Sequence, residues 1–412
     1  MNHLNLTSQE AAFDFLDSYA SARKEEIDRR KLSKDSGFIK SYSLETSPTN
    51  GGVAFDQSYI ERLVDDVRWR ISPIGQQNFF RADDSEGLVG FIDILSERHL
   101  AFHTFREARR MDQVICNLVN RSSRLDFLWL SGNYLNLLWE GLIREYMPQR
   151  FVTFKFEHQG RFEDVEWDGV GDDESEETGE ESDEDTEIRE RRASTLKVTA
   201  RVNKVSRFLP QLQSVLPDFK AIKMLRIPAT EMPGGYEFWD WGKVTYRSPN
   251  FRDGRGYLRE ITQSYQKVTE FIEQQTWFQA EKIHLHDGTE TLNLTGTPIT
   301  FRFPEPLALG TFQGFVEATF ERGKGPFRLW GNPLRLSDRK VHVYGLDLHL
   351  WQRIFLELTP SGFTAILPKH TCGNTIHRLV SNIQRFISPD VETYVGEKSY
   401  QNIVKEMLLY GT

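Results

Sequence analysis

The chain has 412 residues, a length that suffices for two or three domains with buried cores. An aromatic content of 12% excludes a disordered protein, and two cysteines exclude a disulfide framework, which favours a reducing compartment and a cytoplasmic location. The formal net charge of −9 is misleading, because one acidic tract hides a mildly basic remainder of the chain.

The first 55 residues predict a helix followed by a flexible arm. Thr7 and Glu10 have the spacing of a capping box, so a helix is expected to follow, with a charged second half that frays into a loop. Residues 34–55 are polar and contain several glycines, which is typical of a linker. The start of the chain lacks the pattern of a secretory signal, and no window of about 18 apolar residues predicts a membrane span.

Residues 56–205 predict an α+β domain. Helical periodicity appears over residues 58–71, 105–120 and 134–146. A short apolar run at 125–130 and alternating segments at 151–158 and 195–202 predict strands.

The last two of these strands flank an acidic tract. Residues 163–190 carry 16 acidic side chains and one arginine, and without them 50 basic residues face 44 acidic ones. We interpret the tract as a long disordered insertion between two strands of one sheet, with its ends close together. Two roles stay open: the tract lies over a basic groove and is autoinhibitory by competing with a polyanion, or it keeps the protein in solution.

Residues 206–412 predict a second α+β domain. A strand at 221–228 and a turn-rich segment at 231–256 precede a long helix from Tyr257, whose core-facing stripe is Leu258, Ile261, Tyr265, Val268 and Ile272. A mostly antiparallel sheet is expected from strands at 281–286, 292–296, 299–303, 315–321, 327–331, 340–351, 354–359 and 363–368. A helix from Asn374 or Thr375 closes this sheet, and a short helix at 402–410 follows.

Arginine and aromatic side chains interleave over residues 246–259. The candidate binding residues are Arg247, Phe251, Arg252, Arg255, Tyr257 and Arg259. A loop of this composition holds phosphates and stacks on unpaired bases, which suggests single-stranded nucleic acid as a partner. The alternative is a solvated loop whose arginines pair with nearby acids.

One cysteine lies where a strand gives way to a helix. Cys372 precedes the apolar stripe Ile376, Leu379, Val380 and Ile383, and the N–H groups of a helix start stabilise a thiolate. Arg378 follows six places later and is expected to point away from the core face.

The spacing Cys372-x5-Arg378 is similar to the phosphate-binding loop of protein tyrosine phosphatases. The resemblance implies a cysteine-dependent hydrolase or phosphatase in which Cys372 attacks phosphorus and Arg378 holds the oxygens. His349 and His370 are candidate partners of the thiol. Leu379 stands where that family has a hydroxyl residue. The alternative interpretation is a core helix with a small buried thiol.

Metal and cofactor motifs are weak. Candidate ligands are His342, Asp347, His349, His370, Cys372 and His377, but a metal needs three or four that converge, and we assign no metal. The chain has no Gly-rich phosphate loop, no dinucleotide fingerprint and no G-x-S-x-G, so no cofactor is assigned.

The sequence therefore favours a two-domain α+β protein of the cytoplasm. Its expected role is non-catalytic binding or regulation, with a protein or single-stranded nucleic acid as the partner and no membrane partner. The alternative is an enzyme that uses Cys372.

Overall fold

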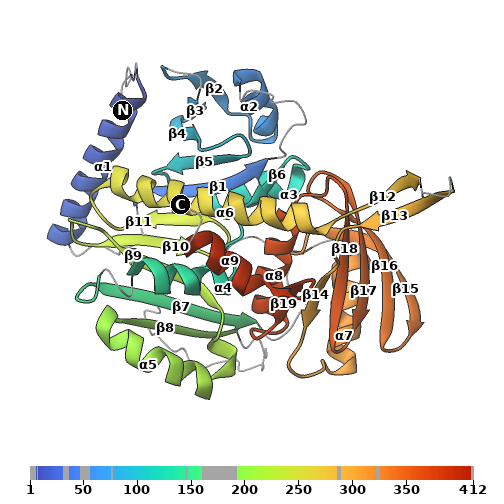
Figure 1. Ribbon diagram of the computed structural model, residues 1–412. Coiled ribbons are helices and arrows are strands. Elements are labelled where there is room, and N and C mark those ends of the chain that lie inside the picture. Colours follow the sequence, from blue (N-terminus) through green and yellow to red (C-terminus); the bar gives the residue numbers. More distant parts are fainter. Residues whose placement is uncertain are drawn as a thin grey trace, which may run out of the picture.

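The structure, a computed structural model, describes residues 8–30, 37–46, 56–75, 78–143, 147–159, 193–284, 289–321 and 325–409, together with Leu6. These residues form two mostly antiparallel sheets with helices around and between them (Figure 1). The predicted α+β class is confirmed. The acidic tract, residues 163–190, lies outside the described residues.

The first sheet has eleven strands in the described part of the chain. In spatial order they are β2 (Arg70–Pro73), β3 (Phe79–Asp84), β4 (Gly87–Ile94), β5 (His99–Thr104), β1 (Lys40–Thr46), β11 (Lys243–Tyr246), β10 (Gly235–Trp239), β9 (Ile222–Pro228), β7 (Phe151–Gln159) and β8 (Ala193–Arg201), with β6 (Leu125–Phe127) beside β1.

The strand β1 corrects the sequence analysis, which predicted a linker over residues 34–55. β1 lies in the middle of the sheet between β5 and β11, and all seven of its residues are buried. Two of its polar side chains have these partners inside the protein: Lys40 Nζ donates to the carbonyl of Arg106 at 2.6 Å, and Ser41 Oγ lies 2.6 Å from His103 Nδ1. Because these partners are distant in sequence, composition alone made the strand look like a linker.

The two strands that flank the acidic tract pair as predicted. β7 and β8 are antiparallel neighbours from Phe151 opposite Arg201 to Gln159 opposite Ala193. The chain therefore leaves the sheet after Gln159 and re-enters it at the residue directly opposite. The insertion is confined to one end of a continuous ladder.

The first sheet continues past the predicted domain boundary at residues 205/206. β9, β10 and β11 belong to it, although β10 and β11 lie in the segment that the sequence analysis described as turn-rich. The chain changes from the first sheet to the second along one helix, α6 (Phe251–Thr276).

The remaining helices are short or amphipathic. They are α1 (Gln9–Arg30), α2 (Gln57–Leu63), α3 (Ala108–Arg121), α4 (Gly132–Leu138), α5 (Val202–Val215), α7 (Leu309–Val316), α8 (Asn374–Phe386) and α9 (Tyr400–Leu409), with single turns η1 (Asp65–Val67), η2 (Trp139–Ile143), η3 (Pro217–Phe219) and η4 (Glu317–Glu321). The predicted fraying is wrong for residues 22–30, which are helical and carry ion pairs of Lys24 with Asp28 at 2.5 Å and of Arg29 with Glu25 at 2.8 Å, whereas residues 31–36 of that segment lie outside the described residues.

The second sheet has nine strands in the described residues. They are β15 (Leu329–Ser337), β16 (Lys340–Asp347), β17 (Gln352–Thr359), β18 (Gly362–Pro368), β14 (Ile299–Arg302), β19 (Glu392–Val395) and β20 (Lys398–Ser399) in spatial order, with β12 (Trp277–His284) beside β18 and β13 (Glu290–Thr295) beside β12. The strand predicted at 315–321 is wrong: these residues end α7 and form η4, and Phe315, Val316 and Phe320 are buried at helical spacing.

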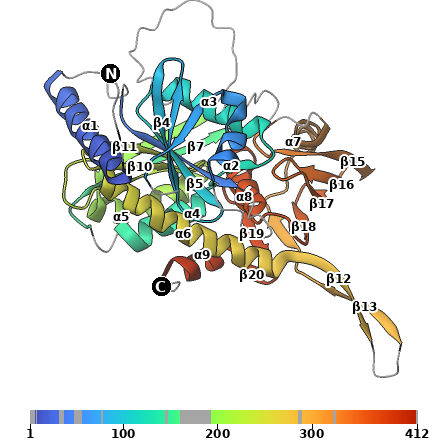
Figure 2. The same cartoon turned by 90° about the horizontal axis from the view of Figure 1, so that it is seen from above.

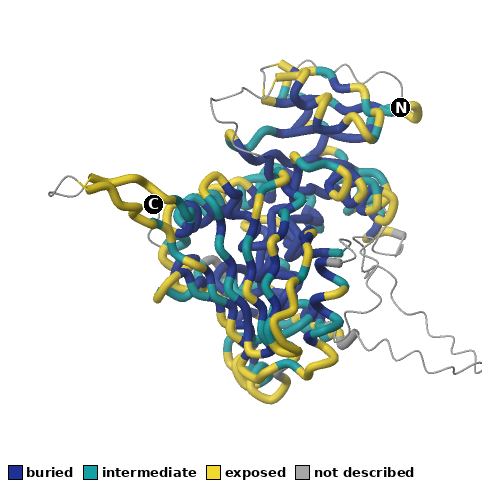
Figure 3. Tube along the Cα trace, turned by 90° about the vertical axis from the view of Figure 1, so that its right-hand side faces the viewer, coloured by how far each residue is buried: buried dark blue, intermediate teal, exposed yellow. Residues whose placement is uncertain are grey.

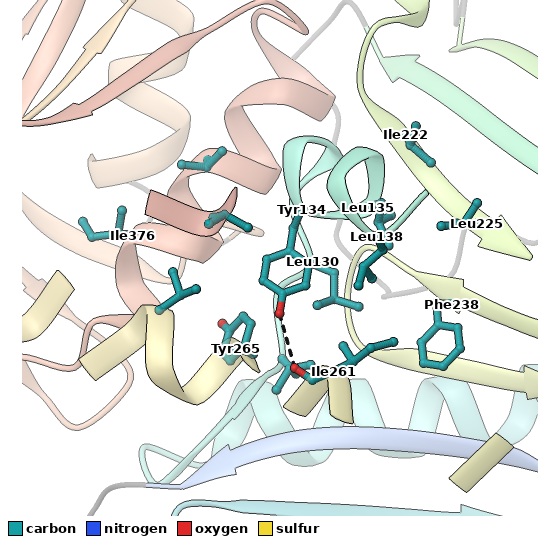
Figure 4. Close-up of a cluster of buried hydrophobic side chains, with 14 of the residues drawn as sticks. Leu130, Tyr134, Leu135, Leu138, Ile222, Leu225, Phe238, Ile261, Tyr265 and Ile376 are labelled. Atoms are coloured by element: carbon teal, nitrogen blue, oxygen red, sulfur yellow. Dashed lines mark hydrogen bonds between the residues drawn. The ribbon is translucent and has the colours of Figure 1, made fainter. Parts of the chain in front are cut away.

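The long helix α6 carries the predicted stripe, but it begins at Phe251, six residues before the expected start. The Asn250 side chain caps it by accepting from the Asp253 N–H at 2.9 Å. Its stripe packs into a core shared by α4, α8 and the first sheet (Figure 4), where the Tyr134 hydroxyl donates to the Ile261 carbonyl at 3.3 Å. One hydrophobic core therefore runs through both sheets.

Candidate functional site

The arginine and aromatic residues predicted to bind nucleic acid lie on the first turns of α6 and just before it. Arg252 faces three acids of α1: its guanidinium contacts Glu10 at 2.7 Å, Asp14 at 2.7 Å and Asp17 at 3.0 Å. These acids are spaced four and three residues apart, so they share one face of α1. The cation of Arg252 is therefore neutralised inside the molecule.

Two neighbouring arginines are paired in the same way. Arg255 Nε contacts Asp93 on β4 at 2.6 Å, and Arg247 Nε contacts Glu237 on β10 at 3.0 Å. Burial alone raises the pKa of Glu237, but the guanidinium of Arg247 and that of Arg226 bring it down to about 2. These arginines stabilise contacts between elements that are far apart in sequence.

The remaining members of the set differ in how far they are buried. Phe251 is fully buried, whereas Tyr257 is half-buried and Arg259 is exposed on the surface of α6. The segment is a helix and not the flexible loop that the sequence analysis described. Stacking on unpaired bases needs exposed rings, and Phe251 offers none.

A layer of buried charged side chains lies between the two sheets, and we call it the seam. Its first cluster joins Glu45 of β1, Arg98, Glu273 of α6 and Cys372. Arg98 Nε donates to Glu45 at 2.9 Å and Arg98 Nη2 to Glu273 at 2.8 Å. Burial alone raises the pKa of Glu45, but Arg98 and His99 together outweigh it and hold the pKa well below its usual value.

Cys372 belongs to this cluster as a protonated thiol. Its Sγ lies 3.4 Å from Glu45 Oε1 and 3.4 Å from Arg98 Nη2, and the residue is 4% exposed. Burial raises the pKa of the thiol well above its usual value, and the Glu45 carboxylate raises it further. Nucleophilic chemistry needs an accessible thiolate, and this environment disfavours one.

The second cluster surrounds Arg378 of α8. Its guanidinium contacts Asp126 of β6 and, at 2.6 Å, Asp347 of β16, while its Nε donates to the Phe327 carbonyl at 2.9 Å. Arg328 Nη1 also reaches Asp126, at 3.3 Å. Burial raises the pKa of Asp126, but Arg378 and then Arg328 outweigh burial and lower it.

The position of Arg378 corrects the prediction that it points away from the core. The residue is 0% exposed, because α8 is enclosed on its polar side as well as on its apolar side. Arg378 turns toward Asp126 and Asp347, whereas Cys372 turns toward Glu45 and Arg98. The cysteine and the arginine therefore do not share a phosphate cradle.

The histidines considered with Cys372 are also separated. His349 is fully buried, its Nδ1 lies 3.9 Å from Asp126, and burial lowers its pKa. His370 is exposed and its ring lies 5.7 Å from that of Trp277. His342 faces solvent on β16 and contacts Glu357 at 2.9 Å. No hydrogen bond in the described part of the chain joins Cys372 to His349, His370 or Arg378.

Strained backbone marks the loops of the second sheet that border the seam. Of the described non-glycine residues, five have positive φ, and four of them lie here: Arg328 at 49°, Leu350 at 67°, Trp351 at 52° and His370 at 73°. Each bulky residue in this conformation costs about 1–3 kcal/mol. Contacts such as the 2.6 Å hydrogen bond from Leu350 N to Ser123 O hold the loops to the first sheet.

A small polar cavity lies beside α8. Its lining includes buried side-chain atoms with no hydrogen-bond partner among the described residues, on Asp240, Ser381 and Arg385, while Lys223 Nζ pairs with Glu157 at 2.5 Å. Burial and then the charge of Arg385 lower the pKa of Lys223 to about 8. The cavity volume of about 10 Å3 matches one water molecule and is too small for a metabolite.

Large apolar side chains gather on the solvent-facing side of β15, β16 and β17, which we call the outer face. Strand pairing places Trp330 opposite Leu346 and Asn332 opposite Tyr344 on this side. Its exposed apolar members, with Trp351 in the adjoining turn, are Trp330, Leu334, Leu336 and Tyr344, each more than half exposed. The sequence analysis missed this surface, although Trp330, Leu334 and Leu336 stand an even number of residues apart and so share one side of a strand.

The described residues contain no group of three or more His, Cys, Asp or Glu side chains placed to hold a metal. Among these residues, no helix combines the length and the apolar character that crossing a bilayer requires.

Comparison with known proteins places the whole chain in one family. The chain is 22% identical over 438 residues to the protein named "Uncharacterized protein MJECL33" of Methanocaldococcus jannaschii, which covers 96% of this chain and 95% of the relative. No solved structure matches. The family model of the MJECL33-like proteins matches residues 3–404, so the chain belongs to the MJECL33-like protein family.

Proposed function

We propose that this protein is a non-catalytic binding protein whose outer face engages another protein. The observation that carries the proposal is the distribution of exposed apolar side chains. Of the thirteen large apolar residues that are exposed in the described chain, five lie on β15, β16 or the turn after β16. The first sheet, although it has more strands, contributes one, Phe151.

The exposed apolar area of the outer face supports its proposed role as a contact surface for another protein. An aromatic side chain presents about 150–250 Å2, so five half-exposed large residues expose roughly 500 Å2 together. The largest apolar patch on a typical monomer spans about 300–600 Å2 and is often functional. Trp351 adds a second argument, because its backbone is strained while its side chain is 61% exposed.

The charges around the patch favour a partner with acidic flanks. Lys340 and His342 share the carboxylate of Glu357, at 2.8 and 2.9 Å. Arg339 and Arg353 are exposed at the margins of the same strands. A partner with an apolar stripe between acidic residues complements this surface, as an amphipathic helix does.

Pro333 argues against strand addition at β15. β15 is the edge of the second sheet in the described residues, and proline offers no N–H to a further strand. A partner therefore packs on the side chains of the outer face and does not extend the sheet.

Nucleic acid and catalysis receive less support. Arg247, Arg252 and Arg255 are neutralised by acids of this chain, and the Cys372 thiol is buried and protonated. In the described residues, the outer face offers protein binding a group of exposed apolar side chains on adjoining strands.

The test is quantitative capture from an extract of the source organism by tagged protein. The double variant Trp330→Ala/Tyr344→Ala removes the two aromatic side chains of adjoining strands, and Val215→Ser/Leu216→Ser removes exposed apolar side chains on α5 as a matched control. We expect the first variant to capture at least tenfold less of one acidic protein than wild type does. The second variant should capture the same amount as wild type. Equal capture by both variants, with both folded, would contradict the proposal.

A further inference from the structure

The strands β12 and β13 form a hairpin that projects from the body of the protein. They pair from Gln279 opposite Thr295 to His284 opposite Glu290. Every described residue from Ala280 to Leu294 is exposed, and the views from above and from the side show the hairpin extending away from both sheets (Figures 2 and 3). A two-stranded hairpin of this kind is marginally stable in water unless something packs on it.

The outer edge of β13 is open for strand pairing. Among the described residues β13 pairs only with β12. Proteins usually protect such an edge with proline, charge or a bulge. Residues Thr291–Thr295 carry no proline and no charge, and their register with β12 is regular. The edge strand β15 differs, because Pro333 interrupts it.

The sequence of this edge is self-complementary. Thr291, Leu292, Asn293, Leu294 and Thr295 read the same in both directions around Asn293. Two antiparallel strands related by a two-fold axis at Asn293 therefore place Leu292 opposite Leu294 and Thr291 opposite Thr295. We propose that two copies of this chain associate by pairing β13 with β13 about this axis.

The side chains suit this pairing on both sides of the resulting four-stranded sheet. Leu292 and Leu294, which are 63% and 65% exposed in one copy, join those of the second copy in a cluster of four leucines. Threonines pair on the opposite side, where their branched side chains favour extended strands.

The charges at the ends of the strand do not oppose the pairing. Glu290 comes opposite Gly296 of the second copy, so no like charges face each other across the axis. The Glu290 carboxylate also lies 3.5 Å from Lys282 Nζ within its own hairpin. The strand contact is small compared with a standard interface of about 1,600 Å2, so the dimer should dissociate on dilution.

The first test uses engineered disulfides. In the proposed dimer the two Asn293 residues face each other with Cα atoms about 4.5–5.5 Å apart, a distance that a disulfide spans. Asn293→Cys should therefore cross-link to dimer on mild oxidation. Glu281→Cys is the matched control, because Glu281 lies opposite Asn293 on β12 and the two copies of it are about 14 Å apart. Both native cysteines are buried and give little background.

The register has its own test. Thr291→Cys and Thr295→Cys should each give no disulfide-linked dimer on oxidation, whereas a mixture of the two variants should form the heterodisulfide. Cross-linking of either variant alone would place the axis elsewhere and overturn the proposed register.

Sedimentation velocity of the unmodified chain tests association itself. Wild type should form a dimer as concentration rises, and Leu294→Lys should raise the dissociation constant at least tenfold, while Val215→Lys on α5 should not. A chain that is monomeric at all concentrations, or equal cross-linking of the Asn293→Cys and Glu281→Cys variants, would refute the proposal. The outer-face variants should dimerise normally, so failure of the proposed function is distinguishable from failure of this inference.

Discussion

Replacing Arg378 by methionine tests whether the seam holds the two sheets together. Methionine preserves the apolar stem and removes the guanidinium. The change deletes contacts to Asp126, to Asp347 and to the Phe327 carbonyl, all at a site that is 0% exposed. Breaking a buried pair by removing one partner costs about 3–5 kcal/mol, since a buried carboxylate is left without its counter-charge. We expect a loss of this size at pH 7.

The pH dependence of that loss follows from Asp126. Its lowered pKa in the wild type means that its ion pairs stabilise the fold at neutral pH and lose this effect as pH falls below the usual range of a carboxyl. Without Arg378, burial dominates and the carboxyl takes up a proton at higher pH. The difference in stability between variant and wild type should therefore shrink from pH 8 to pH 5.

Urea denaturation followed by tryptophan fluorescence measures both effects. Arg353→Met is the matched control, because Arg353 is exposed, and it should change the free energy of unfolding by less than about 0.5 kcal/mol. A loss below about 1 kcal/mol for Arg378→Met, or a loss that is the same at pH 5 and pH 8, would refute the view that the seam depends on buried charge pairs.

Three further predictions concern other parts of the fold. Glu45→Gln should lower the free energy of unfolding by about 2–4 kcal/mol at pH 7. Because the pKa of Glu45 is depressed, its contribution is present at neutral pH and lost in acid, so the stability of the variant should fall less than that of wild type between pH 5 and pH 3. Urea denaturation across this pH range measures both, and an equal fall for variant and wild type would contradict the prediction. The Cys372 thiol should react with an aromatic disulfide reagent at least 100-fold more slowly in the native protein than in urea, since it is buried and protonated, and fast native labelling would contradict its placement. Replacing residues 160–192 by Asn-Gly between Gln159 and Ala193 should raise stability by about 2 kcal/mol through the lower cost of closing a short loop, and loss of folding would show that the insertion is required.

The parts of the fold that could be predicted from the sequence are those with a clear apolar period. The stripe from Leu258 to Ile272 and the stripe from Ile376 to Ile383 each identified a helix. The alternation of apolar and polar residues in β7 and β8 was strong enough to predict two paired strands, one on each side of the acidic tract in the sequence. In these segments one face is apolar, so local sequence reflects burial directly.

Sequence patterns failed where polar residues are buried. β1 contains Lys40, Ser41 and Glu45, whose partners lie more than 50 residues away in the sequence, so the segment looked solvent-exposed. Arg378 was placed on the solvent side of α8 for the same reason. A rule that assigns charged residues to solvent cannot detect a buried charge whose partner is more than 200 residues away, as Asp126 is from Arg378.

The unbroken course of α6 has a mechanical consequence. Its 26 residues make a rod about 39 Å long, anchored at one end by Arg252 against α1 and continued at the other directly into β12. A force applied to the tip of the hairpin is therefore transmitted along α6, a stiff helix whose far end lies in the opposite half of the molecule. Side-by-side pairing of two such hairpins along β13 would fix the distance and the angle between the bodies that they carry.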